Sequence, residues 1–364
     1  MSNTGLYIHV PFCAKKCAYC DFYSGSYSRK DSDDYTDAVI RNLRHYAAES
    51  LTADTVYFGG GTPSLLSGEQ LKKIMDEINR GFTLSPDAEV TLEANPSTLT
   101  PEKLKSIHEA GVNRLSIGVQ SMSDSELKFL GRNHTAERAA KAVTDAQDSG
   151  FSNISCDLMI GLLGQTPDSV YSSINALSKL DIQHISAYIL KVEKGTPFDC
   201  DEVRSLLPDD EATSDLYLAM VNTMEAHGFM QYEVSNFAKS GFESRHNCRY
   251  WKCEDYIGIG PSAHSCHGGK RFAVANSTRE FIESPVQNIT ITDDSPCGFE
   301  EYAMLRLRLK EGLDLRRVPE NRLDIEKKLP QLMREGYINY ENDIVSLTAK
   351  GFLMSNSVIE YLIF

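Results

Sequence analysis

Short apolar, strand-like runs alternate with longer amphipathic stretches through the first half of the chain. The strand-like runs cover residues 6–10, 55–58, 89–93, 114–119, 153–160 and 184–190. The amphipathic, helix-like stretches cover residues 33–48, 68–79, 101–110, 136–149, 167–180 and 208–227. Such alternation is typical of right-handed βαβ units around a parallel sheet. Six units are too few for a closed eight-stranded barrel, so the pattern predicts an α/β fold with an open, partial (β/α)6 barrel.

The alternation stops at about residue 230. Residues 231–271 are rich in Gly, His, Cys and aromatic residues and have few helix signals, so we expect loops and short strands packed on the barrel. Helical patterning returns at 299–310, 322–335 and 348–362, with two short strands at 337–340 and 344–347. Helices followed by a small hairpin resemble a winged-helix module. We therefore expect a barrel domain at 1–230, a loop-rich extension at 231–297 and a small C-terminal module at 298–364.

The net charge limits the kinds of partner that we expect the chain to bind. A formal net charge of −14 over 364 residues argues against a broad nucleic-acid-binding surface and against electrostatic docking to an anionic membrane. Peripheral membrane contact through a local basic patch stays open. No apolar run approaches the roughly 18 residues that a spanning helix needs, and the N-terminus has no signal-peptide pattern. We expect a cytoplasmic protein that is a monomer or a weak homodimer and binds no nucleic acid.

Three of the nine cysteines lie close together, directly after the first predicted strand, where a parallel barrel places a functional loop. They are Cys13, Cys17 and Cys20. Thiolates are the ligands of iron–sulfur clusters, and three ligands for four irons leave one iron open to a chelating amino acid. On spacing alone, a zinc site with a distant fourth ligand is the alternative.

Polar or glycine residues recur where the following strands end. They are Gly60, Gly61 and Thr62 after the second strand, Glu93 at the end of the third, Gln120 at the end of the fourth and Asp157 within the fifth. Each of them alone fits an ordinary turn, a helix cap or a buried polar group. Because the carboxyl ends of parallel strands meet at one mouth of a barrel, their recurrence predicts a ligand site there.

Four motifs resemble the oxygen-independent coproporphyrinogen III oxidase family of radical-SAM proteins. They read YIHVPFC, GGGTP, SIGVQS and DLMIG, and the resemblance runs over nearly the whole chain. It implies a [4Fe–4S] cluster on the three cysteines, with S-adenosylmethionine (SAM) on the open iron. In that family an electron from the cluster cleaves SAM to methionine and a 5′-deoxyadenosyl radical.

The resemblance also implies a role for each SAM-binding position. Gly60, Gly61 and Glu93, with Thr62 in the same turn, would hold the amino group, and Arg132 would hold the carboxylate. Gln120 and Asp157 would bind the ribose hydroxyls. Tyr19, Met159 and Ala187 would frame the adenine, and Tyr7 would lie beside the cluster.

Three features indicate the branch of the family. The decarboxylating oxidases of heme synthesis have a further cysteine two residues after the third ligand, where this chain has Phe22, and a long extension before the first strand. The segment from His246 through Tyr250 to Trp251 resembles the His-Asn-x-x-Tyr-Trp motif of HemW-type heme chaperones. An imidazole can bind heme iron, and the two aromatic rings can pack on a porphyrin. His246 is thus the predicted iron ligand; the nearby alternatives are His264, His267, Cys248, Cys253 and Cys266.

These features predict a heme chaperone that binds heme, a [4Fe–4S] cluster and SAM and delivers heme to acceptor proteins, in particular respiratory ones. The radical-SAM residues are present, but we expect no turnover of coproporphyrinogen and assign no catalytic residue. The alternatives are an oxygen-independent coproporphyrinogen III oxidase and a radical-SAM enzyme with an unrelated substrate.

Overall fold

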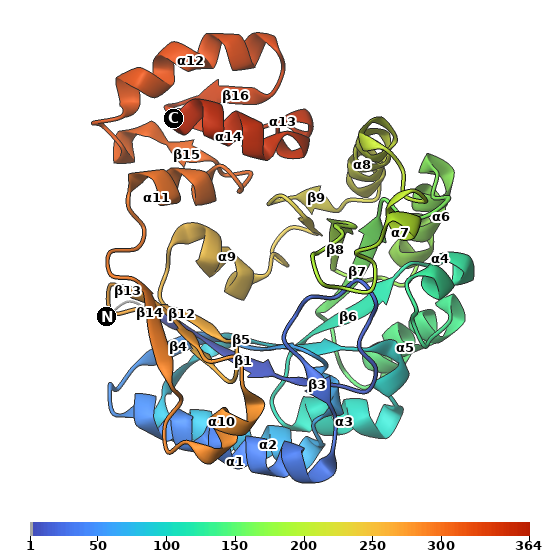
Figure 1. The fold of residues 1–364 in the computed structure, drawn as a ribbon, viewed down its shortest axis with the longest axis vertical. Coiled ribbons are helices and arrows are strands. Elements are labelled where there is room, and N and C mark those ends of the chain that lie inside the picture. Colours follow the sequence, from blue (N-terminus) through green and yellow to red (C-terminus); the bar gives the residue numbers. More distant parts are fainter. Residues whose placement is uncertain (1–2) are drawn as a thin grey trace.

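The computed structural model describes residues 3–364, which are built around one open 12-stranded sheet (Figure 1). Six neighbouring strands of this sheet are parallel: β1 (Thr4–Val10), β4 (Thr52–Gly60), β5 (Thr83–Ala94), β6 (Arg114–Gln120), β7 (Ile154–Ile160) and β8 (His184–Ile189). Their order in the sheet follows their order in the chain. The predicted α/β class and the six parallel strands of a partial barrel are therefore confirmed.

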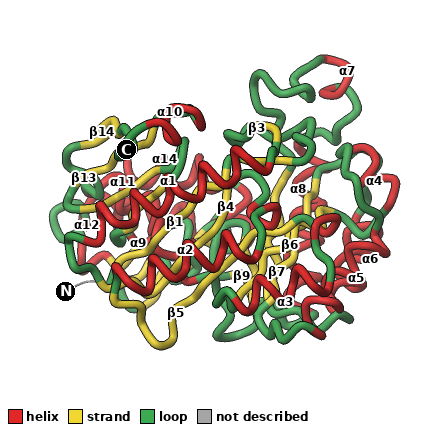
Figure 2. Tube along the Cα trace, turned by 90° about the horizontal axis from the view of Figure 1, so that it is seen from below, coloured by secondary structure: helices red, strands yellow, loops and turns green. Residues whose placement is uncertain are grey.

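The helices that connect these strands cover the outside of the sheet. They are α1 (Arg29–Ala47), α2 (Gly68–Gly81), α3 (Pro101–Glu109), α4 (Asp124–Phe129), α5 (Ala136–Asp148) and α6 (Pro167–Ser178). Two more helices follow β8, of which α8 (Asp210–Ala226) packs on α6, while α7 (Asp201–Arg204) has no buried residue. Figure 2 shows α1 and α2 lying along the strands. Local capping sets several boundaries, because Ser67 and Gln70 form a capping box at α2, and Thr100 caps α3 with Pro101 in its first turn.

The segment after residue 230 differs from the expectation of loops and short strands, because it contains a helix, α9 (Arg245–Lys252). Ser244 caps α9, but the helix itself consists mainly of residues with modest helix propensity, and packing against the barrel stabilises it. The rest of the segment extends both edges of the sheet. β9 (Met230–Gln231) and β10 (Asn236–Ala238) lie beyond β8, whereas β11 (Tyr256–Ile259) pairs in parallel with β1.

Antiparallel strands continue the sheet past β11. They are β12 (His264–His267), β13 (Lys270–Val274) and β14 (Ile289–Asp293), with α10 (Thr278–Glu283) between the last two. Directly after β1 in the chain, β2 (Phe12–Cys13) pairs in parallel with β3 (Gly25–Ser26), separately from the main sheet.

The C-terminal elements form a small module beyond α9, which they approach through α11 (Figure 1). They are α11 (Phe299–Arg306), β15 (Leu313–Asp314), α12 (Arg322–Arg334), β16 (Ile338–Glu341), β17 (Ile344–Leu347), α13 (Ala349–Leu353) and α14 (Ser355–Ile363). The three strands make an antiparallel sheet in which β17 is central. The expected hairpin is present; the winged-helix likeness and the three domain boundaries stay predictions. Among residues 3–364, no helix has both the length and the apolar character needed to cross a membrane.

Candidate functional site

Of the three cysteines of the first motif, Cys13 ends β2 and Cys17 and Cys20 lie on the loop between β2 and β3, at the mouth where the parallel strands end. All three thiols are half-buried and free of disulfides. Cys13 Sγ accepts a hydrogen bond from Thr62 Oγ1 at 3.6 Å, and Cys17 Sγ accepts one from Arg132 Nη1 at 3.3 Å. Within residues 3–364 no three His, Cys, Asp or Glu side chains are gathered closely enough to hold a metal ion. The donor set, three soft thiols on one loop with polar groups beside them, fits an iron–sulfur cluster that gathers the thiols when it binds.

The glycine turn after β4 docks directly onto this loop. Gly61 N donates to Val10 O at 2.8 Å, and Thr62 N donates to Phe12 O at 2.7 Å. Gly60 has φ +105°, and a Cβ there would lie 2.6 Å from the ring of His9. A Cβ on Gly61 would lie 2.6 Å from the carbonyl oxygen of Phe12. Glycine is required at Gly60 because of the positive φ and the ring of His9, and at Gly61 because the turn and the start of the cysteine loop approach so closely.

Two buried carboxyl groups lie below the glycine turn. Glu93 accepts from Tyr57 OH at 2.9 Å and from Gly60 N at 3.1 Å. Burial, together with the charge of Asp157, raises the pKa of Glu93 to about 7. Burial raises the pKa of Asp157 to about 6, although Ser116 Oγ donates to it at 3.1 Å. A bound ammonium group would favour the charged form of Glu93, which suits the predicted role beside the SAM amino group.

The remaining predicted SAM positions surround the same mouth. Arg132 Nη2 donates to Gly118 O at 2.8 Å, while its Nε is buried without a hydrogen-bond partner in the described part of the chain. Gln120 ends β6 with φ +69°, an uncommon conformation for a residue with a side chain. Tyr19 packs on an apolar cluster that contains Met159, whereas Ala187 is buried in the main core beside β7. The structure thus brings these positions together, and their individual roles stay predictions.

Tyr7 lies inside the barrel, between the mouth and the opposite end. Its ring stacks at 6.1 Å on Tyr57 and at 6.3 Å on His246, and its hydroxyl lies 3.1 Å from His9 Nδ1. The other ring nitrogen of His9 lies 3.0 Å from the carbonyl oxygen of Tyr23. Sequence reasoning did not identify His9 and Tyr57, although both alternate with apolar residues along strands whose inner face is polar.

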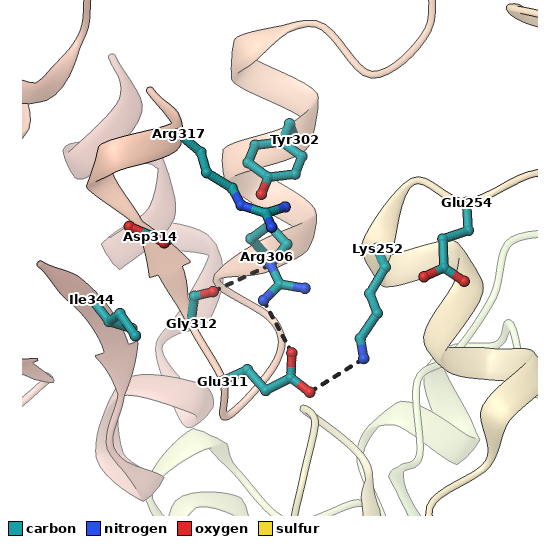
Figure 3. Close-up of a pocket in the computed structure, with 9 residues that line it drawn as sticks. All are labelled: Lys252, Glu254, Tyr302, Arg306, Glu311, Gly312, Asp314, Arg317 and Ile344. Atoms are coloured by element: carbon teal, nitrogen blue, oxygen red, sulfur yellow. Dashed lines mark hydrogen bonds and ion pairs between the residues drawn. The ribbon is translucent and has the colours of Figure 1, made fainter. Parts of the chain in front are cut away.

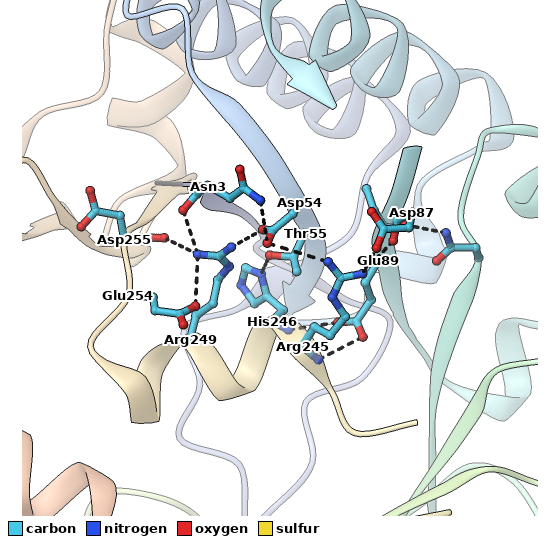
Figure 4. A network of polar contacts seen from close by, with 12 residues as sticks. Asn3, Asp54, Thr55, Asp87, Glu89, Arg245, His246, Arg249, Glu254 and Asp255 are labelled. Carbon is cyan, nitrogen blue, oxygen red and sulfur yellow. Dashed lines mark hydrogen bonds and ion pairs between the residues drawn. The ribbon is translucent and has the colours of Figure 1, made fainter. Parts of the chain in front are cut away.

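The predicted heme motif lies at the other end of the barrel, where α9 covers the first residues of the strands (Figure 4). We call this end the floor, formed by α9 and the strand starts around Gly5, Thr55, Glu89, Arg114 and His184. His246 is fully buried, with Nδ1 2.8 Å from Thr55 Oγ1 and Nε2 2.8 Å from Tyr250 OH. Burial, then the charges of Arg249 and Arg114, lowers the pKa of His246 to about 3. The imidazole is therefore neutral, and both of its ring nitrogens are engaged.

Charged groups fasten α9 to the floor (Figure 4). The backbone N–H groups of Arg245 and His246 each donate to Glu89 at 3.1 Å, which places a carboxylate at the helix N-terminus. Arg249 is 4% exposed, pairs with Asp54 and donates to two backbone carbonyl oxygens. The fit is close, because a Cβ on Gly5 would lie 2.8 Å from Arg249 Cδ.

The other members of the predicted heme motif lie outward from His246. Tyr250 packs edge-on against Tyr256 at 4.6 Å, and Trp251 is half-buried. Cys248 lines a cavity of about 770 Å³ between α9 and the C-terminal module, and burial raises the pKa of its thiol to about 12. His267 faces Glu49, with its Nε2 2.7 Å from the carboxylate.

A second cavity, of about 600 Å³, adjoins the first (Figure 3). Lys252 of α9 and Arg306 of α11 enter it, and both pair with Glu311, at 3.2 Å and 3.1 Å. The pair between Lys252 and Glu311 joins α9 to the C-terminal module, whereas the pair between Arg306 and Glu311 lies within that module. Charges of both signs line this cavity.

Comparison with known proteins identifies the family. Residues 7–177 match the Radical SAM superfamily. The heme chaperone HemW of Bacillus subtilis is 39% identical over 97% of this chain and 97% of its own length. HemW of Escherichia coli is 35% identical over 98% and 97%, and HemW of Mycobacterium tuberculosis is 36% identical over 99% and 94%. The chain belongs to the HemW family.

Membership of the HemW family bears on the cofactors of the mouth. Its radical SAM membership implies a [4Fe–4S] cluster and SAM, for which the mouth has suitable residues. The solved structure of coproporphyrinogen III oxidase from Escherichia coli covers 100% of this chain and 90% of that one, with a TM-score of 0.82 and 21% identity. That likeness shows a common fold. The nearly full-length relatives are named heme chaperones, so the coproporphyrinogen oxidase alternative is not favoured.

Proposed function

We propose that this chain is a heme chaperone that binds heme and delivers it to acceptor proteins, in particular respiratory ones. The observation that supports this most is the 39% identity over nearly the full length with a relative named heme chaperone HemW. Phe22 agrees with it, because this position has a cysteine in the decarboxylating oxidases that the motifs resemble. Its side chain is 63% exposed beside the cysteine loop.

At the mouth, Cys13, Cys17 and Cys20 would hold the [4Fe–4S] cluster, and Arg132 and Glu93 would orient SAM. The cluster and SAM, when bound, supply one-electron chemistry. The chain itself contributes binding groups: thiols for iron, Glu93 for an ammonium group, and the Arg132 guanidinium for a carboxylate.

A continuous chain of contacts supports communication between the mouth and α9. The ring of His246 stacks on Tyr57 at 5.1 Å, Tyr57 OH donates to Glu93, and Glu93 accepts from the backbone N–H of Gly60. A movement of His246 would remove packing from Tyr57 and thereby loosen Glu93. Heme at the floor and SAM at the mouth would then influence each other's affinity, and the effect must be reciprocal.

Iron binding by His246 requires a local change, because Tyr250 holds the Nε2 atom. We propose that the hydroxyl of Tyr250 leaves Nε2 when heme arrives, which frees this nitrogen to bind iron. The neutral state of the imidazole favours this, since a metal ligand must be unprotonated.

The experiment is heme loading of the full chain under anaerobic conditions, followed by gel filtration and measurement of the retained Soret band. His246→Ala should lose the band. Tyr250→Phe should keep or strengthen it, because Nε2 is then free, while the exposed His45→Ala serves as the control. Full retention by His246→Ala would contradict His246 as the iron ligand.

The coproporphyrinogen oxidase alternative needs a separate assay. The reconstituted protein is incubated anaerobically with coproporphyrinogen III and SAM, and decarboxylated products are sought by mass spectrometry. We expect none beyond the level given by Cys17→Ala. SAM-dependent product above that level would overturn the proposal of a chaperone without this turnover.

A further inference from the structure

Arg114, the first residue of β6, has a charged side chain that nothing in the proposed function uses. It is 2% exposed and heads the order by volume of the fully buried side chains. Within residues 3–364 its Nε has no hydrogen-bond partner, and no carboxylate forms an ion pair with it. A buried charge without a partner destabilises a protein, so its presence calls for an explanation.

The side chain points into the barrel. Along β6, Leu115, Ile117 and Val119 are fully buried in the outer core, so the alternate residues face the interior. Ser116, on the same face as Arg114, donates a hydrogen bond to Asp157 on the neighbouring strand β7. The charge of Arg114 also acts on groups from several other strands and from α9, among them Glu93, His184 and His246.

His184, on which the charge of Arg114 acts, is neutral and bonded to its neighbours on the floor. His184 Nδ1 lies 2.7 Å from Ser155 Oγ, and its Nε2 lies 2.8 Å from Tyr232 OH. Because Tyr232 OH accepts from Ser244 N at 3.1 Å, its own hydrogen is available to donate to His184. Burial, then the charge of Arg114, holds the pKa of His184 well below its usual value. These groups therefore offer no counter-charge to the guanidinium.

Several aromatic side chains on the inner face of the barrel or beneath it are accessible to solvent. Tyr188 lies on the inner face of β8, in line with His184 and Ser186, and is nevertheless 42% exposed. Tyr7 and Tyr250 are only half-buried although they lie within or under the barrel. The phenol and imidazole rings provide flat walls, and Arg114 provides the strong hydrogen-bond donors at the bottom.

We propose that Arg114 binds the carboxylate of a guest in the barrel interior and that this carboxylate is a propionate of the heme cargo. A guanidinium binds a carboxylate through two parallel charge-assisted hydrogen bonds, which would satisfy the unpartnered donors of Arg114. The carboxylate part of the inference rests on the geometry of the barrel alone. The heme part rests on the proposed function.

The test compares Arg114→Met with the wild-type full chain by Soret titration, using hemin and hemin dimethyl ester, which has no free carboxylate. Arg114→Met should weaken hemin binding about tenfold to a hundredfold, as expected for a lost hydrogen bond between charged groups. Binding of the dimethyl ester should be unchanged by the substitution. Arg114→Lys should fall between the two, and the exposed Arg279→Met should match wild type.

The melting temperature of the variant distinguishes a ligand-binding role of Arg114 from a structural one. If Arg114 is kept for a ligand, the melting temperature of ligand-free Arg114→Met should equal or exceed that of wild type, because an unpaired buried charge has been removed. A lower melting temperature, with hemin and its ester weakened equally, would overturn the proposal. Unchanged hemin affinity in Arg114→Met would overturn it as well.

A third measurement distinguishes this inference from the proposed function. Succinate and propionate are titrated against thermal stability without heme. A stabilising shift in wild type that Arg114→Met lacks supports the carboxylate site even if wild type binds no heme, in which case the heme part is wrong. The absence of any carboxylate effect on stability and on heme binding overturns both parts.

Discussion

The two ends of the barrel use the same six strands in opposite ways. At the mouth, thiols, bare glycine backbone and two carboxyl groups with raised pKa values face one another with few bonds among them. At the floor, many polar contacts hold α9 against the strands, and both ring nitrogens of His246 are engaged. The mouth is therefore built to be completed by cofactors, whereas the floor is completed by the chain itself. On the floor, Arg114 is a buried charged residue without an ion-pair partner among the residues that the structure describes, so its presence needs an explanation.

The largest expected effect tests whether α9 is a structural closure of the floor. Arg249→Met should lower the free energy of unfolding by about 3–5 kcal/mol, because it leaves the partly buried Asp54 and two carbonyl groups without their partner. Urea unfolding of the full chain measures this. Arg245→Met, on the same helix but 42% exposed, should cost less than about 1 kcal/mol. Equal effects of the two variants would contradict a tightly fastened floor.

The second largest expected effect concerns the glycine turn at the mouth. Gly60→Ala should destabilise the chain by about 2–4 kcal/mol and impair cluster reconstitution, because the positive φ is strained and the new Cβ meets the ring of His9. Iron and sulfide content after reconstitution gives the readout. Gly164→Ala is the matched control, since its φ is +70° with no atom within 4 Å of a Cβ. If both variants reconstitute equally well, the close approach of the glycine turn to the cysteine loop does not matter for the cluster.

The smallest expected effect comes from the raised pKa of Glu93 at the mouth and is tested by varying the pH. The folded state raises the pKa of Glu93 from 4.5 to about 7, so it holds the proton more tightly than the unfolded chain does. Stability from this group is present below pH 4.5 and is lost as the pH rises toward 7. Glu93→Gln should therefore be more stable than wild type by about 1 kcal/mol at pH 8, with no such gain at pH 4. Urea unfolding at both pH values checks this, with the exposed Glu137→Gln as control; a difference that does not vary with pH would contradict it.

Much of the mouth could be predicted from the sequence because its residues follow from local rules. The strands alternate with capped helices, and the parallel strands bring Gly60, Glu93 and Gln120 to one end. The floor could not be predicted in the same way. Thr55 and His246 are 191 residues apart, and no local pattern reveals that they share a hydrogen bond. Ser244 was an available signal for the start of α9, but the composition of the following residues obscured it.

His9, Tyr57 and Arg114 illustrate a related limit. Each lies in a strand whose apolar character is clear, and each occupies the inner face of the barrel. In the sequence, such a strand has the same alternation of apolar and polar residues as a strand whose polar face meets solvent. Only the closure of the barrel by α9 turns that face into an interior, which depends on contacts between segments far apart in the chain.

The pairing of β1 with β11 has a consequence for synthesis on the ribosome. Tyr7 pairs in register with Gly258, so one edge of the first strand has no partner until about 250 further residues have been made. At about 5–20 residues per second, that edge stays open for roughly 12–50 seconds. An unpaired strand edge is a site of aggregation, and all but one of the residues of β1 are buried in the folded chain. The newly made chain is therefore most prone to aggregation before its last third has been synthesised. The rate of translation then limits its maturation, as does the loading of its cofactors.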